Sequence, residues 1–145
     1  PSAEDVPKGY LNMLELKQEI MKIFQIFCKG EGILYFCNAG KDRTGVVTIL
    51  ISMLIGISEE LIYEDYLESK KYLASIIKLN KISDDVSRII TPKREYIEEF
   101  FKLFYAKYNS IEEYLKLIED TRNTISSIYG IIKNTISNPA LPLSP

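Results

Sequence analysis

YFCNAGKDRTG, residues 35–45, breaks the apolar pattern of the chain and brings together a cysteine, a lysine, an aspartate, an arginine and two glycines. A short apolar run at residues 33–36 overlaps its start, and a longer apolar run at 46–55 follows it. The first run predicts a buried strand, and the second predicts a buried helix over residues 44–55. The stretch therefore lies in a loop from a strand to a helix N-terminus, where proteins often bind anions.

The residues of this loop suit a phosphate group and a nucleophile. Gly40 can adopt the left-handed conformation that a ring of inward-pointing amides needs, and Gly45 would let the first helical turn pack closely. Arg43 carries a planar guanidinium that matches two phosphate oxygens. We expect Cys37 to face the same donors, which would lower the pKa of its thiol. The pattern predicts an activated sulfur nucleophile in a phosphate-binding loop.

Five residues separate Cys37 from Arg43, and a threonine follows. This C-x5-R spacing resembles the cysteine-dependent phosphatases of the protein tyrosine phosphatase superfamily. The longer string CNAGKDRTG is similar to the HC-x-AGKDRTG loop of a bacterial tyrosine/serine phosphatase family. Three other segments resemble that family: YLNML at 10–14, EDYLESKKY at 64–72 and REYIEEFFKLFYAKYNSIEEYLK at 94–116.

The resemblance implies a role for each loop residue. Cys37 would attack phosphorus and form a phosphocysteine, and Arg43 would bind the phosphoryl oxygens. Thr44 would hydrogen-bond the sulfur, Asp42 is the candidate general acid, and Lys41 would add charge at the rim, as in phosphoinositide-active relatives. The phosphate-binding residues implied are Asn38, Ala39, Gly40, Lys41, Asp42, Arg43 and Thr44. No metal and no cofactor is expected, since the loop itself supplies the charge stabilisation.

Each of these roles has a plainer alternative. Cys37 on its own would be a buried core cysteine, but with the rest of the loop the catalytic interpretation is favoured. Asp42 could equally be an acid that stabilises the helix dipole, and Lys41 could be a solvated surface charge. Cys28 is expected to be an inert core residue. A Walker loop is disfavoured because an aspartate, and not serine or threonine, follows the lysine.

The sequence departs from the family pattern in three places. Phe36 precedes Cys37 where the family has histidine, Asn109 replaces a usual glycine, and only a short segment precedes the loop. We therefore expect an α/β fold seen as its C-terminal, mostly helical part, with the phosphate loop between a central strand and a buried helix. Residues 1–137 would form this part of a phosphatase domain, with the loop at 37–43, and residues 138–145 an extended tail.

The helices expected elsewhere follow from apolar spacing and capping residues. Residues 78–92 are expected to be polar and irregular. The remaining predicted helices are 11–27, 58–77 with Ser58 as N-cap, 95–108 ended by Asn109, 111–120 with a capping box of Ser110 and Glu113, and a weak one at 121–137. The single strand would lack neighbours, and the apolar faces of helices 11–27 and 95–108 would lack part of their cover, so a homodimer is expected.

Composition narrows the function classes. The chain has 145 residues, 46% of them hydrophobic and 26% charged, which suits one globular domain. The net charge of −2 does not suggest a basic surface for binding nucleic acid. No apolar run is long enough to span a membrane. Histidine is absent, which excludes catalysis and metal ligation by that residue. Two cysteines make no disulfide framework, so a reducing cytoplasm is expected.

The expected activity is hydrolysis of phosphate monoesters through Cys37. Phosphotyrosine in proteins is the first candidate substrate and phosphoinositides are the second. Inorganic phosphate or sulfate should also bind in the loop. Two alternatives of another class remain: a truncated, non-catalytic phosphate-binding fragment, and a helical interaction domain with a vestigial loop.

Overall fold

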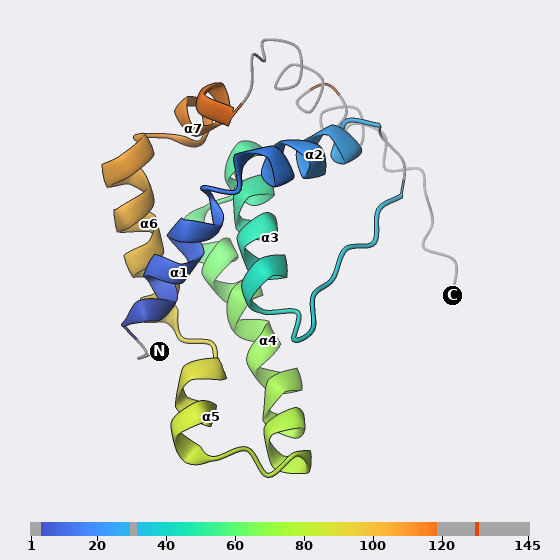
Figure 1. Cartoon of the computed structure of the whole chain (residues 1–145), viewed down its shortest axis with the longest axis vertical. Helices are drawn as coiled ribbons and strands as arrows, with labels where there is room; N and C mark the ends of the chain where they lie inside the picture. The colour runs from blue at the N-terminus through green and yellow to red at the C-terminus, as the bar shows by residue number, and fades with distance from the viewer. Residues whose placement is uncertain (1–3, 30–31, 119–129, 131–145) are drawn as a thin grey trace.

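The fold is a set of helices around one core, seen in a computed structural model that describes residues 4–29, 32–118 and 130. No strand occurs within these ranges. Figure 1 labels the helices, which are α1 (Asp5–Met13), α2 (Lys17–Phe27), α3 (Asp42–Leu54), α4 (Glu59–Leu79), α5 (Asp84–Ile90), α6 (Arg94–Tyr108) and α7 (Ile111–Ile118). No helix in the described part of the chain combines the length and the apolar character needed to cross a membrane.

The predicted helix over 11–27 is wrong, because the chain bends between α1 and α2. Three successive backbone bonds at the junction run from residue i to i−3, which tightens the last turn of α1, and Leu16 leaves the helical conformation. Leu14 is fully buried at this bend, and its carbonyl accepts a 2.9 Å bond from the Tyr114 hydroxyl. Glu15 accepts bonds from Lys107 and Tyr108 of α6. The apolar spacing favours one continuous helix over 11–27, but contacts with α6 and α7 hold the chain in a bend between α1 and α2.

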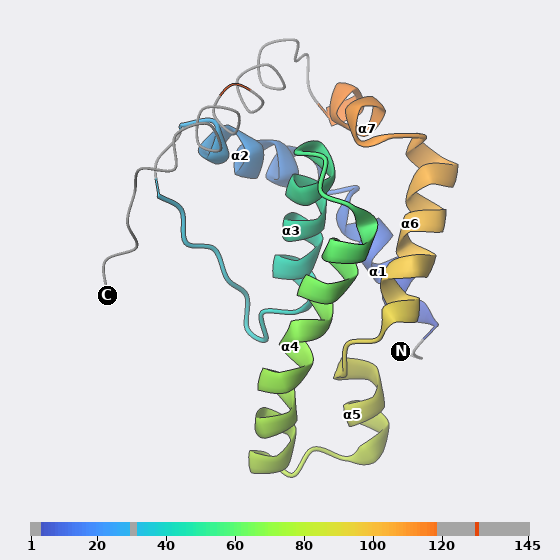
Figure 2. The ribbon, with the colours of Figure 1, turned by 180° about the vertical axis from the view of Figure 1, so that it is seen from behind.

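α3 supplies the central apolar helix, as predicted, with a start two residues earlier. It contacts α1, α4 and α7, and Figures 1 and 2 show it running among them. Its side chains are apolar on several sides, which fits a helix surrounded by others. Gly56, with a φ of 77°, ends it. The position matters for the site, since the N-terminus of this buried helix is where the 35–45 loop arrives.

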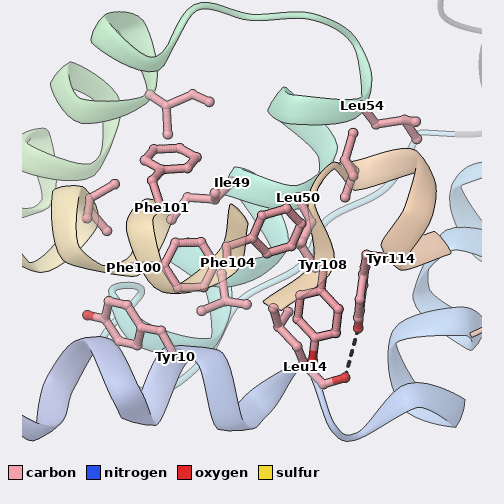
Figure 3. Close-up of a cluster of buried hydrophobic side chains, with 14 of the residues drawn as sticks. Tyr10, Leu14, Ile49, Leu50, Leu54, Phe100, Phe101, Phe104, Tyr108 and Tyr114 are labelled. Atoms are coloured by element: carbon pink, nitrogen blue, oxygen red, sulfur yellow. Dashed lines mark hydrogen bonds between the residues drawn. The ribbon is translucent and has the colours of Figure 1, made fainter. Parts of the chain in front are cut away.

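The core is completed by the aromatic face of α6, shown in Figure 3. α1 packs mainly on this helix. The prediction that the faces of the helices at 11–27 and 95–108 would lack cover is wrong for α6, whose face is buried against α1, α4 and α7 and shares one core with the apolar side chains of α3. The buried residues of that face are Tyr96, Ile97, Phe100, Phe101, Phe104 and Tyr108. The apolar face of α1 and α2 is covered as well, because it buries Tyr10, Leu14, Ile20 and Phe24. Uncovered helix faces are therefore no longer a reason to expect a dimer.

Residues 84–90 correct a second prediction, because the segment expected to be irregular contains α5. Ser83 has an extended backbone before the helix, and Asp84 and Asp85 lie in the first turn, where acids are favoured. The helix is short and none of its residues is buried. Its C-terminal end is held by the Tyr96 hydroxyl, which donates a 3.3 Å bond to the Arg88 carbonyl. The polar composition of this segment favoured a loop, although Ser83 and the two aspartates that follow it are residues typical of a helix start.

The predicted ends of the later helices agree with the structure. Asn109 ends α6 with a φ of 67°, and the Ser110 hydroxyl accepts a 3.2 Å bond from the amide of Glu113. Only this half of the capping box forms, because the Glu113 carboxylate pairs with Lys116. The weak helix expected at 121–137 and the tail at 138–145 lie outside the described residues, apart from Gly130, which is helical.

Residues 32–37 run as an extended segment without a sheet partner in the described chain. Both ribbon views show this segment standing apart from the helices before it turns into α3 (Figures 1 and 2). Leu34 is 86% exposed and Phe36 is 81% exposed, so the prediction that residues 33–36 are buried is wrong. Tyr35 anchors it through a ring contact with Phe27 and a 2.9 Å hydrogen bond with Thr48. A lone extended segment has no ladder, and the predicted strand is therefore absent.

Candidate active site

The 37–45 loop turns sharply into the N-terminus of α3. Gly40 has a φ of 65°, the left-handed conformation that its position was predicted to need. The first bond of the helix runs from the Gly45 amide to the Lys41 carbonyl, so the amides of Asp42, Arg43 and Thr44 precede the helical ladder. Gly45 lies against the Tyr66 ring, although a methyl group there would meet the ring at 3.6 Å, an ordinary contact.

Cys37 is a half-buried thiol beside these amides. Burial is the largest single influence on the pKa of this thiol, and it raises the pKa. The hydroxyl and amide of Thr44 and the amides of Ala39 and Gly40 lower the pKa, and their combined effect is larger than that of burial. The pKa of the thiol is about 7, below the ordinary value of 9.0. Much of the sulfur is therefore thiolate near neutral pH, which is the nucleophilic form.

Thr44 contributes to this environment through a hydroxyl that is otherwise unsatisfied. Its Oγ1 atom is buried and forms no hydrogen bond of ordinary geometry with another described residue. It nevertheless helps to lower the pKa of Cys37. The two observations are compatible, since a neutral thiol is a weak acceptor and the negatively charged thiolate is a stronger one. The hydroxyl is thus available to the ionised sulfur.

Lys41 does not lie at the rim of the loop, where it was expected. Its side chain is 3% exposed, and Nζ lies 2.6 Å from Oδ1 of Asp42 and 3.3 Å from the Tyr10 hydroxyl. The ammonium is therefore neutralised by a carboxylate and hydrogen-bonded inside the fold. This lysine is therefore not a solvated charge at the rim of the loop.

Asp42 is the first residue of α3 and is held from two sides. Oδ1 accepts a 2.7 Å bond from the hydroxyl of Tyr10 in addition to the bond from Lys41. The Tyr10 hydroxyl also lies 2.8 Å from that of Tyr66. Because the single proton of Tyr10 goes to the carboxylate, Tyr66 is the donor to Tyr10. Burial is the main cause that raises the pKa of both tyrosines, so they remain neutral hydroxyl donors.

Sequence reasoning missed these two tyrosines. Tyr10 lies in YLNML and Tyr66 in EDYLESKKY, segments that carried only the family resemblance. Each falls on the apolar face of its helix, and a buried tyrosine hydroxyl usually has a hydrogen-bond partner. That requirement was the available signal, although it could not reveal that the partner is Asp42.

The guanidinium of Arg43 is exposed and forms no hydrogen bond or ion pair with another described residue. It lines a cavity of about 360 Å³ between α1, the start of α3 and the end of α5. Lys41 and Asp42 line the same cavity, whose other walls include the apolar side chains of Val6, Met13, Ile89 and Ile90. The structure thus brings Arg43 and Asp42 to one cavity, whereas Cys37 is not among the residues that line it.

The opposite side of the loop faces α4. A second cavity, of about 510 Å³, is lined by Ala39, Gly40 and Thr44 of the loop region and by acidic and aromatic residues of α4. Asp65 and Glu68 contribute carboxylates to that wall, but Glu68 is paired with Lys71, and Lys41 also lines the cavity. This side of the loop therefore carries charges of both signs.

Known proteins with similar sequences include phosphatases. The model of the tyrosine phosphatase family matches residues 1–130. A protein of Cupriavidus necator, provisionally named a tyrosine-protein phosphatase, is 40% identical over 42 residues, which are 29% of this chain and 15% of that protein. The triple specificity protein phosphatase PtpB of Mycobacterium tuberculosis is 34% identical over 53 residues, 37% of this chain and 19% of that protein. The aligned part spans less than a fifth of either relative.

Proposed function

Because the chain belongs to the tyrosine phosphatase family, we propose that it hydrolyses phosphate monoesters through a phosphocysteine intermediate on Cys37. The observation that carries the proposal is the thiol pKa of about 7 at the N-terminus of a buried helix. Nucleophilic sulfur and anion-binding amides occur together there. The substrate proposed is phosphotyrosine in proteins, since apolar side chains line the cavity beside Arg43 and Asp42 and would suit an aryl group.

The proposed reaction has two steps. The Cys37 thiolate donates its electron pair to phosphorus, the S–P bond forms, and the bond to the leaving oxygen breaks. Asp42 must carry a proton on Oδ2 before this step, and it gives that proton to the leaving oxygen, so a neutral alcohol or phenol leaves. Water then attacks the phosphocysteine and returns its proton to Asp42, and the sulfur leaves as thiolate beside the Thr44 hydroxyl.

Arg43 and the loop amides would stabilise the phosphoryl oxygens in both steps. The exposed guanidinium has no bond to another described residue that must first be broken. Bidentate binding would make Arg43 sensitive even to lysine, whose ammonium cannot replace the planar fork. We expect Arg43→Lys to lower kcat/KM for an aryl phosphate by about a hundredfold.

The phosphoinositide alternative loses the observation that motivated it. It rested on a lysine charge at the rim of the loop, and Lys41 is buried and paired with Asp42. The non-catalytic alternative is retained as an outcome of the experiment: a fragment that only binds phosphate would be stabilised by phosphate without turning over a substrate.

The experiment measures release of p-nitrophenol from p-nitrophenyl phosphate by the parent chain and by Cys37→Ser and Cys28→Ser. Cys28 packs against the core at the end of α2, so its serine variant is the matched control for loss of a thiol. Turnover that Cys37→Ser abolishes and Cys28→Ser retains supports the proposal. Equal turnover in both variants would refute it. Thermal stabilisation by inorganic phosphate, with no turnover, would favour the non-catalytic fragment.

A further inference from the structure

The carboxylate of Asp42 is held by one oxygen. The bonds from Lys41, at 2.6 Å, and from Tyr10, at 2.7 Å, both end on Oδ1. Neither bond uses Oδ2, and the side chain is 41% exposed. The arrangement restrains Oδ1 and leaves Oδ2 outside both bonds, so that Oδ2 can carry a proton. Oδ1 can accept both bonds whether or not Oδ2 carries that proton.

Tyr10 is a rigid donor for this purpose. It belongs to α1, 32 residues away from Asp42 in sequence, and is 2% exposed. Its ring makes edge contacts with Tyr66 and Phe100, at centroid distances of 6.3 and 6.4 Å. The contact with Tyr66 and the bond between the two hydroxyls leave Tyr10 little freedom to turn. Lys41, the other donor to Oδ1, is the residue next to Asp42 in the chain.

We infer that Tyr10 is a positioning residue for the general acid, holding Oδ1 of Asp42 so that Oδ2 is presented toward the leaving group. This inference rests on the proposed phosphatase function. The role concerns the step in which the bond from phosphorus to the leaving oxygen breaks and that oxygen takes the proton from Oδ2. Its benefit grows with the basicity of the leaving oxygen, because a poor leaving group depends most on protonation.

Tyr10→Phe is the direct variant, because it removes the hydroxyl and keeps both ring contacts. Its control is Tyr114→Phe, which also removes a buried, bonded hydroxyl, but at the carbonyl of Leu14 and away from the loop. The assay compares kcat and KM for p-nitrophenyl phosphate, which has a good leaving group, with those for phenyl phosphate and an alkyl phosphate. Thermal melting of each variant shows that it is folded.

Tyr10→Phe should lower kcat about tenfold more on the alkyl phosphate than on p-nitrophenyl phosphate, with KM little changed, the size expected for the loss of one hydrogen bond. Tyr114→Phe should leave this ratio unchanged even if it melts earlier. In the Asp42→Asn background, Tyr10→Phe should have no further effect on the ratio, because the proton it positions is gone.

The outcomes separate two failures. Cys37-dependent turnover with an equal loss on all three substrates in Tyr10→Phe overturns the positioning role alone. A full further loss in the Asp42→Asn background also overturns it, since the two residues would then act independently. Absence of any Cys37-dependent turnover in the parent overturns the proposed function, and the positioning role with it.

Discussion

The hydroxyl of Tyr114 donates a 2.9 Å hydrogen bond to the backbone carbonyl of Leu14, joining α7 to the bend between α1 and α2 across 100 residues of sequence (Figure 3). Both residues are fully buried. A carbonyl at a helix end that loses its partner in the core keeps the cost of its desolvation. This bond therefore stabilises the packing of α7 against the bend between α1 and α2.

Tyr114→Phe should lower the free energy of unfolding by about 1 to 3 kcal/mol, because it leaves the Leu14 carbonyl without a partner. Urea unfolding followed by circular dichroism measures the change. Tyr105→Phe is the control, since its hydroxyl bonds to Glu59 at the surface and water can replace it. Equal stability of the two variants would show that the bond at the bend contributes nothing particular.

Arg94→Lys should weaken the side-chain contacts between α4 and α6 and lower the melting temperature. The guanidinium forms two 2.7 Å bonds with Glu60 and one with Glu98, and it lies 4.4 Å from the centroid of the Tyr63 ring. A lysine can keep one ion pair but neither the fork nor the stacking. We expect a fall in melting temperature that is smaller than that of Tyr114→Phe and shrinks in high salt, since the pair is solvent-exposed. A salt-independent loss would contradict this account.

The reactivity of Cys37 should follow the ionisation of its thiol. With a pKa of about 7, the sulfur is neutral below that pH and reactive above it, so alkylation by iodoacetamide should reach half its limiting rate near pH 7. Thr44→Val removes a hydroxyl that stabilises the thiolate and should move the midpoint upward. Thr91→Val is the control, since its hydroxyl bonds to the Ser87 carbonyl at the end of α5. A midpoint near 9 in the parent would rule out the activated thiol.

Gly40→Ala should damage the loop, whereas Gly45→Ala should be tolerated. Alanine at 40 would have to adopt a φ of 65°, which costs about 1 to 2 kcal/mol or forces the loop to change. At position 45 the new methyl group would make an ordinary contact with Tyr66. Thermal stabilisation by inorganic phosphate, measured for both variants, should be weakened only in Gly40→Ala. Equal responses would mean that the left-handed turn does not matter for anion binding.

Most helices could be predicted because their signals are local. The end of α6 at Asn109, the start of α7 at Ser110 and the left-handed Gly40 are each set by the conformational preference of one residue. The buried aromatic face of α6 follows from apolar spacing along one helix. The family could be predicted from the loop alone, since the cysteine, the glycine and the arginine lie within seven residues.

The errors arose where tertiary contacts decide. The bend at Leu14 depends on Tyr114, and nothing near residue 14 indicates it. The expected strand at 33–36 required neighbours that the described chain does not provide. The burial of Lys41 depends on a carboxylate next to it and on a tyrosine 31 residues earlier. The sequence pattern places Lys41 in the loop, but it does not indicate the direction of the Lys41 side chain.

The central claim, that Cys37 is the nucleophile, is tested most directly by trapping the intermediate. The parent chain is mixed rapidly with p-nitrophenyl phosphate, quenched in acid and digested, and the peptides are sequenced by mass spectrometry. We predict one phosphoryl group on the peptide that contains Cys37, carried by sulfur, and none on the peptide that contains Cys28. Turnover with the phosphoryl group on another residue, or with no phosphoryl peptide while Cys37→Ser remains active, would contradict the account.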